Sequence, residues 1–186
     1  MKRKRIDTKI FGSLVIVWAG FNGKPIIVRL ILSNPAEGAE EKASRLFPRS
    51  AISSCAEIDA IESSIQRFLA GDDIEYPLDI VELSQCSPFQ RSVLKTEHKI
   101  PRGNVSSYLN IAKHIGNPKG ARAVGTALAQ NPFPLIIPCH RAIRSDRSLG
   151  GFQGGMNMKR ALLEKEGLAF DSTGRIICDR LYYERT

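Results

Sequence analysis

The sequence predicts an α+β protein, with a sheet in the first half of the chain and helices dominating the second. Two apolar runs rich in β-branched residues, 13–18 and 25–32, flank a turn at 20–24, which predicts a β-hairpin. Helical periodicity follows at 39–47 and 58–69. The second half alternates helical patterns with loops that contain Gly and Pro. Strands grouped ahead of helices favour the α+β class.

Two domains are predicted, at 1–85 and 86–186. A turn at 71–73 ends the second periodic helix, and an acidic, proline-containing stretch leads from there to Pro88. A chain of 186 residues is long enough for one compact domain or for two small ones. We therefore expect a sheet-and-helix domain followed by a mostly helical one.

The positive charge of the chain is concentrated in one segment. The net charge is +8, and residues 90–166 hold 13 Lys and Arg against 4 Asp and Glu, whereas the remainder holds 14 against 15. This asymmetry favours a polyanionic partner, most simply nucleic acid. No apolar run approaches the roughly 20 residues that span a bilayer, and no export signal follows the basic start. We expect a cytoplasmic protein, associated with the nucleoid if prokaryotic, with no membrane partner.

The four cysteines, Cys55, Cys86, Cys139 and Cys178, are widely scattered and form no CxxC pair. With only three histidines in the chain, this scatter argues against a zinc site, so neither a metal nor a cofactor is expected. Free thiols are the expectation for an intracellular protein, and a Cys55–Cys86 or Cys86–Cys178 disulfide is left open.

Helical patterns open the second half. One helix is predicted at 90–98, and Ser107 is suited to cap another at 108–115, with Leu109 on its inward face. Gly116 fits the C-terminal cap of that helix.

A further helix is predicted directly after this turn. Asn117 and Pro118 indicate its start, because Asn caps helices and Pro suits the first helical position. Two short helices joined by a Gly-containing turn predict a helix-turn-helix unit. Lys119 and Arg122 lie at the start of the second helix, where recognition contacts usually occur. An ordinary helical hairpin is the alternative.

Residues 138–141 read Pro-Cys-His-Arg and follow the apolar segment 135–137, which we expect to be a short buried strand or extended segment. Positive charge near a cysteine favours the reactive thiolate. The neighbouring histidine is able to accept the thiol proton if a carboxylate holds its other nitrogen. The alternative for Cys139 is packing as a small buried hydrophobe.

These four residues resemble the signature of the O6-alkylguanine-DNA alkyltransferases, also called methylated-DNA–protein-cysteine methyltransferases. The similarity continues in family order and spacing over 89–167 and is looser in the first half. The matching residues include Phe89-Gln90, Ile100-Pro101-Arg102-Gly103, Ser107-Tyr108, Gly116-Asn117-Pro118, Arg122-Ala123-Val124-Gly125, Asn131-Pro132, Leu149-Gly150-Gly151, Lys159 and Glu166-Gly167.

The resemblance implies a fold and a catalytic set. The fold is a ribonuclease H-like β-sheet subdomain, followed by a mostly helical, winged-helix-like domain with the helix-turn-helix. Cys139 is the implied nucleophile, and His140 is the implied general base, acting through a water. Glu166 is implied to orient His140, and Asn131 to tie the helix-turn-helix to the active-site turn.

The resemblance also implies that the damaged nucleotide is flipped out of the duplex into a pocket. Arg122 is implied to fill the vacated place, and Tyr108 to press on the target phosphate and donate to the guanine. The implied DNA-binding residues are Tyr108, Lys119, Arg122, Ala123, Gly125 and Arg141. The implied pocket residues are Tyr108, Leu128, Pro134, Ala142, Phe152, Gln153 and Gly154.

The implied function is DNA repair by direct reversal of damage. One alkyl group passes from O6-alkylguanine, or from O4-alkylthymine, in double-stranded DNA to Cys139 of a monomeric protein. The transfer is stoichiometric and irreversible, because a thioether is not readily cleaved. The alternatives are a non-catalytic lesion sensor, a helix-turn-helix transcription regulator and a cysteine hydrolase. The presence of Cys139 argues against the sensor, and the run at 138–141 is not needed by a regulator.

Several positions depart from the family pattern. Arg147 stands where Gly is usual, which costs about 1–2 kcal/mol if the position requires a positive φ. Ala142 replaces a more usual Val and is expected to widen the pocket. Gly120 replaces a usual Ala and is expected to loosen the recognition helix by up to about 1 kcal/mol. Residues 168–186 extend beyond the usual end and are expected to add a strand or short helix.

Overall fold

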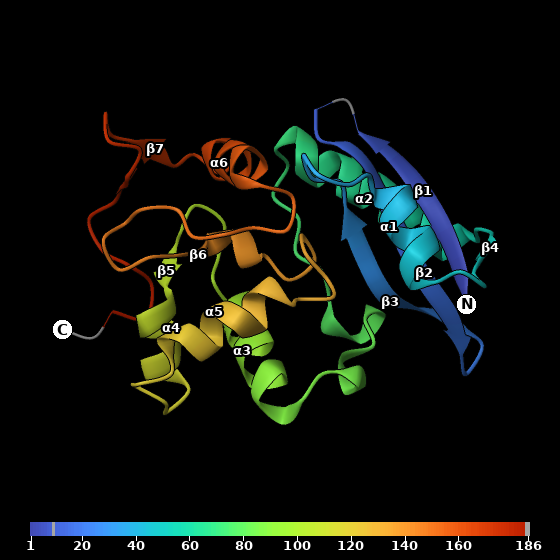
Figure 1. Cartoon of the computed structure of the whole chain (residues 1–186), viewed down its shortest axis with the longest axis horizontal. Coiled ribbons are helices and arrows are strands. Elements are labelled where there is room, and N and C mark those ends of the chain that lie inside the picture. The colour runs from blue at the N-terminus through green and yellow to red at the C-terminus, as the bar shows by residue number, and fades with distance from the viewer. Residues whose placement is uncertain (9, 185–186) are drawn as a thin grey trace. The chain divides into compact units, whose positions relative to one another are not determined.

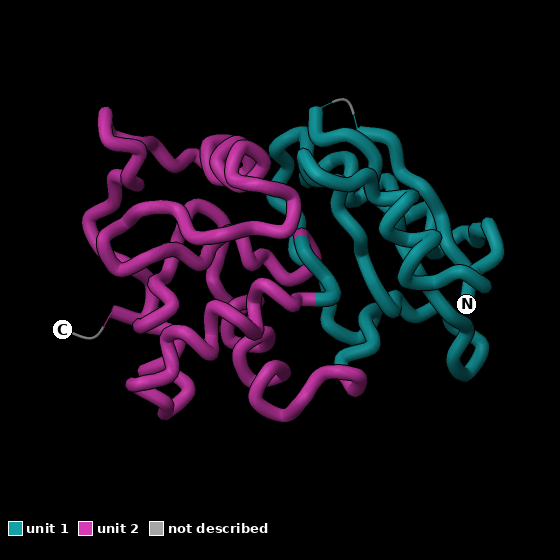
Figure 2. Tube along the Cα trace, viewed as in Figure 1, with its two compact units in different colours: residues 1–83, 132–134 teal, residues 84–131, 135–186 magenta. Residues whose placement is uncertain are grey.

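The computed structural model describes residues 1–8 and 10–184, and the chain divides into two compact units (Figure 2). The first unit is Met1–Leu83 with Pro132–Pro134, and the second is Ser84–Asn131 with Leu135–Thr186. Each unit contains both helices and strands, so the predicted α+β class is confirmed.

A four-stranded sheet forms the centre of the first unit (Figure 1). Its strands are β1 (Lys2–Thr8), β2 (Gly12–Phe21), β3 (Lys24–Leu32) and β4 (Ala51–Ile52), in the order β3-β2-β1-β4. β1, β2 and β3 pair antiparallel, and β4 pairs parallel to β1. The predicted hairpin is confirmed. Phe21 pairs with Lys24 across Asn22 and Gly23, whose positive φ values of 48° and 78° are those of a tight hairpin turn.

Helices α1 (Ala39–Leu46) and α2 (Ala56–Ala70) cover opposite faces of this sheet. Successive side chains of a strand point to opposite faces. On β1, Arg5 forms an ion pair with Glu40 of α1 at 2.5 Å, whereas the preceding Lys4 pairs with Glu62 of α2 at 2.5 Å. A buried apolar cluster beneath α1 consists of Val15, Val17, Ile31, Ala39 and Ala43.

The strand β1 is missing from the sequence prediction. Its basic run at 2–5 shows no apolar alternation, and Ile6 is its only fully buried residue. The positive side chains are held by partners on the two helices instead: besides the two ion pairs, Arg3 donates to Ser44 at 2.9 Å. Hydropathy alone therefore does not predict this strand.

The second unit is built on helices, preceded by the 3-10 turns η1 (Leu78–Ile80) and η2 (Leu83–Gln85). Its helices are α3 (Pro88–His98), α4 (Tyr108–His114), α5 (Ala121–Ala129), α6 (Met156–Lys165) and the 3-10 helix η3 (Cys139–Arg141). Its strands are β5 (Ser106–Ser107), β6 (Ala142–Ile143), β7 (Ala169–Phe170) and β8 (Ile176–Ile177). α3, α4 and α5 pack together, and β5 pairs parallel with β6.

The segment after α6 adds strands, as expected, over its described residues up to 184. β7 pairs antiparallel with β8, and Tyr182 bridges in parallel to Ser106 of β5. The Tyr182 amide donates to the Val105 carbonyl at 2.8 Å. The segment shares a buried apolar cluster with the rest of the unit, formed by Val105, Ile143, Leu163, Ile176 and Leu181.

α4 and α5 are two short helices joined by a turn, but α5 starts later than predicted. Ser107 caps α4 as expected, with its Oγ accepting the Asn110 amide at 3.0 Å. Residues 117–120 form a turn in which the Gly120 amide donates to the Asn117 carbonyl at 2.8 Å, so α5 begins at Ala121 and not at Pro118. The expected loosening by Gly120 is therefore wrong, because this residue caps the helix from outside, where glycine is well tolerated.

Candidate active site

The turn that presents Cys139 is held by side-chain and backbone hydrogen bonds. The preceding segment is buried, as predicted, but Leu135 and Ile136 form a turn in place of a strand or extended segment, and Leu135 adopts a φ of +73°. Asn131 Nδ2 donates to the Ile137 carbonyl at 3.0 Å, and the same carbonyl accepts the Cys139 amide at 2.8 Å. This geometry is what the proposed tie between Asn131 and the active-site turn requires.

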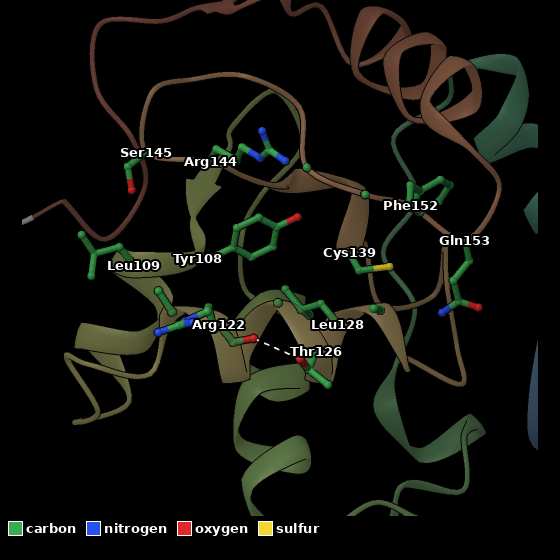
Figure 3. A pocket seen from close by; sticks show the side chains of 15 residues that line it. Tyr108, Leu109, Arg122, Thr126, Leu128, Cys139, Arg144, Ser145, Phe152 and Gln153 are labelled. Carbon is green, nitrogen blue, oxygen red and sulfur yellow. Dashed lines mark hydrogen bonds between the residues drawn. The ribbon is translucent and has the colours of Figure 1, made fainter.

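Cys139 lines an open pocket of about 730 Å³ in the second unit (Figure 3). Arg122, Thr126 and Leu128 of α5 lie along one side, and Arg144 and Phe152 lie along the other. The remaining lining residues are Tyr108, Leu109, Ala121, Gly125, Ala129, Ser145, Gly150, Gly151 and Gln153. Leu109 thus faces the pocket, and not the core as predicted; the fully buried apolar positions on α4 are Ile111 and Ala112.

A buried ion cluster lies next to Cys139. His140 Nε2 is 2.8 Å from Glu166 Oε1. Arg141 donates through Nε and Nη2 to the same carboxylate at 2.8–3.1 Å, and its Nη1 donates to the Ile100 carbonyl at 2.6 Å. The His140 side chain is fully buried, and the Glu166 side chain is 2% exposed. α6 thus brings the predicted carboxylate to the predicted histidine.

The charges of this cluster follow from its surroundings. Burial raises the pKa of Glu166, but hydrogen bonds and charge from His140 and Arg141 outweigh it and hold the pKa at about 2. Burial lowers the pKa of His140, against the opposing effect of Glu166. Near neutral pH, Glu166 is therefore ionised and His140 is a neutral imidazole. An ionised carboxylate only accepts hydrogen bonds, so Nε2 carries the ring proton and Nδ1 is the basic atom.

The buried Cys139 thiol is protonated. Burial raises its pKa to about 12, although a hydrogen bond with Asn131 and the charge of Lys159 oppose the shift. Positive charge from Lys159 acts in the expected direction, but desolvation is the larger effect for a thiol that is 4% exposed. Of the two expected routes to the thiolate, this favours removal of the proton by a neutral base. A reaction at Cys139 has to remove the proton as the sulfur attacks.

Tyr108 crosses the pocket and is held by two glycines. A Cβ on Gly150 would collide with the Tyr108 hydroxyl and lie 2.7 Å from its Cε2, whereas a Cβ on Gly125 would lie 4.0 Å from its Cδ1, an ordinary contact. Burial raises the pKa of Tyr108 to about 12, so its hydroxyl remains a hydrogen-bond donor across the ordinary pH range. Glycine is needed at 150 because any larger residue would displace this ring.

Two buried ionisable residues of the site, Lys159 and Glu97, were not predicted from the sequence. Lys159 is fully buried and donates to the Ala142 carbonyl at 2.6 Å, and burial lowers its pKa to about 8. Glu97 is also fully buried, and burial raises its pKa to about 8, opposed by the charges of Lys159 and Arg141. The sequence contained a signal for both residues, because each is a charged residue on the apolar stripe of a helix. Glu97 lies on the apolar stripe of Val93 and Leu94, and Lys159 lies on that of Leu162 and Leu163.

The remaining predicted site residues divide into two groups. Tyr108, Arg122, Gly125, Leu128, Phe152 and Gln153 line the pocket with Cys139. Pro134, Ala142 and Gly154 do not: Pro134 belongs to the first unit, Ala142 is fully buried, and Gly154 packs against Met158 and Phe152. Ala142 therefore cannot widen the pocket directly.

The DNA-binding assignments change in one case. Arg141 is buried, and all its donors are directed at Glu166 and the Ile100 carbonyl, so a direct contact with DNA is contradicted. Ala123 is exposed on α5, and Lys119 is exposed in the turn before it, not on the helix.

Three further features concern disulfides, metal-binding clusters and membrane-spanning helices. All four cysteines are free thiols. Within 1–8 and 10–184, no three His, Cys, Asp or Glu residues gather as a possible metal site. No helix in that part of the chain has the length and apolar character needed to cross a membrane.

The chain is similar to known proteins in both sequence and structure. The family model described as "6-O-methylguanine DNA methyltransferase, DNA binding domain" matches residues 88–168. The methylated-DNA–protein-cysteine methyltransferase of Methanothermobacter thermautotrophicus is 36% identical over 156 residues, which are 84% of this chain and 80% of the relative. The corresponding protein of Mycobacterium bovis is 43% identical over 102 residues, 55% of this chain and 61% of that relative.

Solved structures of the same kind of protein also match this chain. The Mycobacterium tuberculosis OGT in complex with DNA superposes with a TM-score of 0.69 at 30% identity, covering 90% of this chain and 93% of that one. The O6-methylguanine-DNA methyltransferase of Pyrococcus kodakaraensis shares the fold, with a TM-score of 0.71 at 20% identity over 89% of this chain and 98% of that one. The chain belongs to the methylated-DNA–protein-cysteine methyltransferase family.

Proposed function

We propose that this protein repairs alkylated DNA by taking the alkyl group of O6-alkylguanine, or of O4-alkylthymine, onto Cys139. DNA repair by alkyl transfer to a protein cysteine follows from family membership. The assignment to Cys139 rests on one observation: its thiol lies in the pocket beside α5, next to a buried His140–Glu166 pair.

The chemistry is a single displacement. The Cys139 sulfur attacks the alkyl carbon, so the carbon–sulfur bond forms as the carbon–O6 bond breaks. A water carries the thiol proton to neutral His140, and ionised Glu166 stabilises the imidazolium that results. Tyr108 remains protonated and donates a hydrogen bond to the departing guanine. The guanine leaves as an anion and takes a proton from water, and the His140 imidazolium returns its proton to water. Overall, the thiol loses one proton and the base gains one, which makes it ordinary guanine.

The pocket is suited to a base that has left the stack. A base within a duplex is unreachable, so the nucleotide is extruded into the pocket beside Cys139. Exposed Arg122 at the start of α5 takes the vacated place, where its planar, charged group is able to hydrogen-bond the orphaned partner. Ala123 and Gly125 permit close approach of α5 to the DNA, and Lys119 contacts its backbone.

We also propose the finer features that the sequence implies. The partner is double-stranded DNA with an alkylated base, and the protein acts as a monomer in the cytoplasm, associated with the nucleoid if prokaryotic. A ribonuclease H-like subdomain at 1–85 and a winged-helix-like domain at 86–186 remain predictions.

A titration of protein with damaged DNA tests this function. A duplex with one O6-methylguanine is added in excess, and repaired guanine is counted against protein. We expect repair to stop at one guanine per protein molecule, and the Cys139→Ala variant to repair none. A Cys178→Ala variant, which removes a thiol outside the pocket, is the matched control. Continued turnover, or undiminished repair by Cys139→Ala, would contradict the proposal.

A further inference from the structure

A tight turn at 144–148 places an arginine where the backbone favours glycine. The Arg144 amide donates to the Ser148 carbonyl at 3.0 Å, and the Arg147 amide donates to the Arg144 carbonyl at 3.0 Å. This pattern is a three-residue hairpin loop, whose last residue usually adopts the left-handed conformation. Arg147 adopts it with a φ of +67°. Strain of this kind at a non-glycine residue tends to occur at functional sites.

The segment after α6 meets this turn and adds a second arginine. The Ile176 amide donates to the Arg147 carbonyl at 3.0 Å, and Arg175 bridges antiparallel to Ser148. Asp171 fixes Arg175 by accepting its amide at 3.0 Å. The two departures from the family pattern, Arg147 and the 168–184 segment, therefore meet in space.

The guanidinium groups at this turn make no direct hydrogen bond or ion pair within the described part of the chain. Arg144 and Arg175 are exposed, and Arg147 is half-buried. The acid within the turn is Asp146, whose carboxylate accepts the Ser148 amide at 3.0 Å and the Ser148 hydroxyl at 2.6 Å. Beyond these hydrogen bonds, the charges of Arg175 and Arg144 also lower the pKa of Asp146. The amide and the charge of Arg175 lower the pKa of Asp171. Three guanidinium groups against two carboxylates leave a net positive charge for an external anion.

The turn lies at the pocket that contains Cys139. Arg144 and Ser145 line the pocket on the side across from Arg122 of α5 (Figure 3). We propose that Arg144, Arg147 and Arg175 form a phosphate-binding surface, the arginine rim, that holds the DNA backbone beside the extruded nucleotide. This inference rests on the proposed function. An arginine fork matches the geometry of phosphate oxygens, and a duplex presents a row of them.

The salt dependence of DNA binding tests the rim. The affinity of the whole protein for a short undamaged duplex is measured over a range of salt concentrations for wild type, Arg147→Gly, Arg175→Ala and the double variant. Each lost phosphate contact should reduce the slope of log affinity against log salt by about 1, and weaken binding roughly five- to tenfold at 0.1 M salt. Arg49→Ala is the matched control, since it removes an exposed arginine of the first unit and the same charge.

The Arg147→Gly variant separates an effect on DNA binding from an effect on the stability of the fold. Glycine adopts a positive φ without strain, so this variant should unfold at the wild-type temperature or above it while binding DNA more weakly. If Arg147→Gly and Arg175→Ala have the same slope as Arg49→Ala, and the wild-type protein still takes up methyl groups, the arginine rim is overturned and the proposed function is not. A wild-type protein that gains no methyl group on Cys139 would overturn the rim together with the proposed function.

Discussion

The two units of the molecule differ in how much charge they bury, although both have exposed ion pairs, such as Arg160–Glu164 in the second unit. In the first unit the ion pairs lie at the surface, as in Arg45–Glu37, where the arginine side chain is 59% exposed. In the second unit His140, Arg141 and Glu166 form a cluster whose side chains are at most 8% exposed, with Lys159 and Glu97 also buried. Surface pairs contribute little to stability, and burying charge is costly. The contrast indicates that the second unit retains buried charge for chemistry.

The largest effect expected is that of removing the central carboxylate. Glu166→Gln leaves Arg141 buried without its counter-charge, which should lower the free energy of unfolding by about 3–5 kcal/mol. It also removes the partner that orients His140, so methyl uptake by the folded fraction should slow by about 10²- to 10⁴-fold. Denaturant unfolding and single-turnover kinetics measure the two effects.

The matched change in the first unit sharpens the comparison. Arg45→Ala removes an exposed ion pair, and we expect neither the unfolding midpoint nor the rate of methyl uptake to change measurably. If Arg45→Ala and Glu166→Gln destabilised the protein equally, the contrast between surface and buried charge would be wrong.

Arg122→Ala tests the part of the second unit that meets DNA. Arg122 is exposed and lines the pocket, so its loss should leave the buried cluster intact. Extrusion of a base costs a few kcal/mol, and loss of the inserted side chain should slow repair of duplex DNA by about 10- to 100-fold. Transfer from free O6-methylguanine base should slow far less. Equal losses on both substrates would exclude insertion of Arg122 into the duplex.

Glu97 provides a smaller, pH-dependent test of the buried charges. Its pKa is about 8 in the fold against an ordinary value of 4.5, because of burial. Between these values the folded state binds more protons than the unfolded state, so the free energy of unfolding falls as the pH rises from about 4.5 to about 8.

The variant Glu97→Gln has no such proton to lose. It should be more stable than wild type by about 1–3 kcal/mol at pH 8 and no more stable at pH 4. Unfolding by denaturant at the two pH values measures the difference. A difference that does not vary with pH would mean that Glu97 does not titrate in this way.

Features with local sequence signals were predicted, whereas features that depend on partners distant in sequence were missed. The hairpin and α4 were predicted from apolar periodicity and cap residues, whereas the catalytic set around Cys139 was predicted from resemblance to the alkyltransferase family. β1 was missed because its strand character depends on partners such as Glu40 and Glu62, which are distant in sequence. Arg141 was assigned to DNA because a sequence does not reveal that a guanidinium points inward at Glu166.

The predicted start of α5 and the predicted effect of charge on Cys139 each overlooked an interaction that the sequence does not display. Residues 117–120 close a turn among themselves, and a local cap signal at Asn117 cannot reveal that competing hydrogen bond. The thiol pKa depends on how deeply the fold buries the sulfur, and desolvation there exceeds the effect of neighbouring charge. A local turn decides where α5 begins, and burial of the sulfur decides the protonation of Cys139.

Peptide mass analysis after incubation with damaged DNA tests the central claim most directly. Reduced, folded protein is mixed with a duplex that carries one O6-methylguanine, then digested and analysed. We predict one added methyl group on the peptide that contains Cys139, in proportion to the repaired DNA, and none on the peptides with Cys55, Cys86 or Cys178. An unmodified Cys139 in protein that has bound the duplex, or a methyl group on another cysteine, would contradict the assignment.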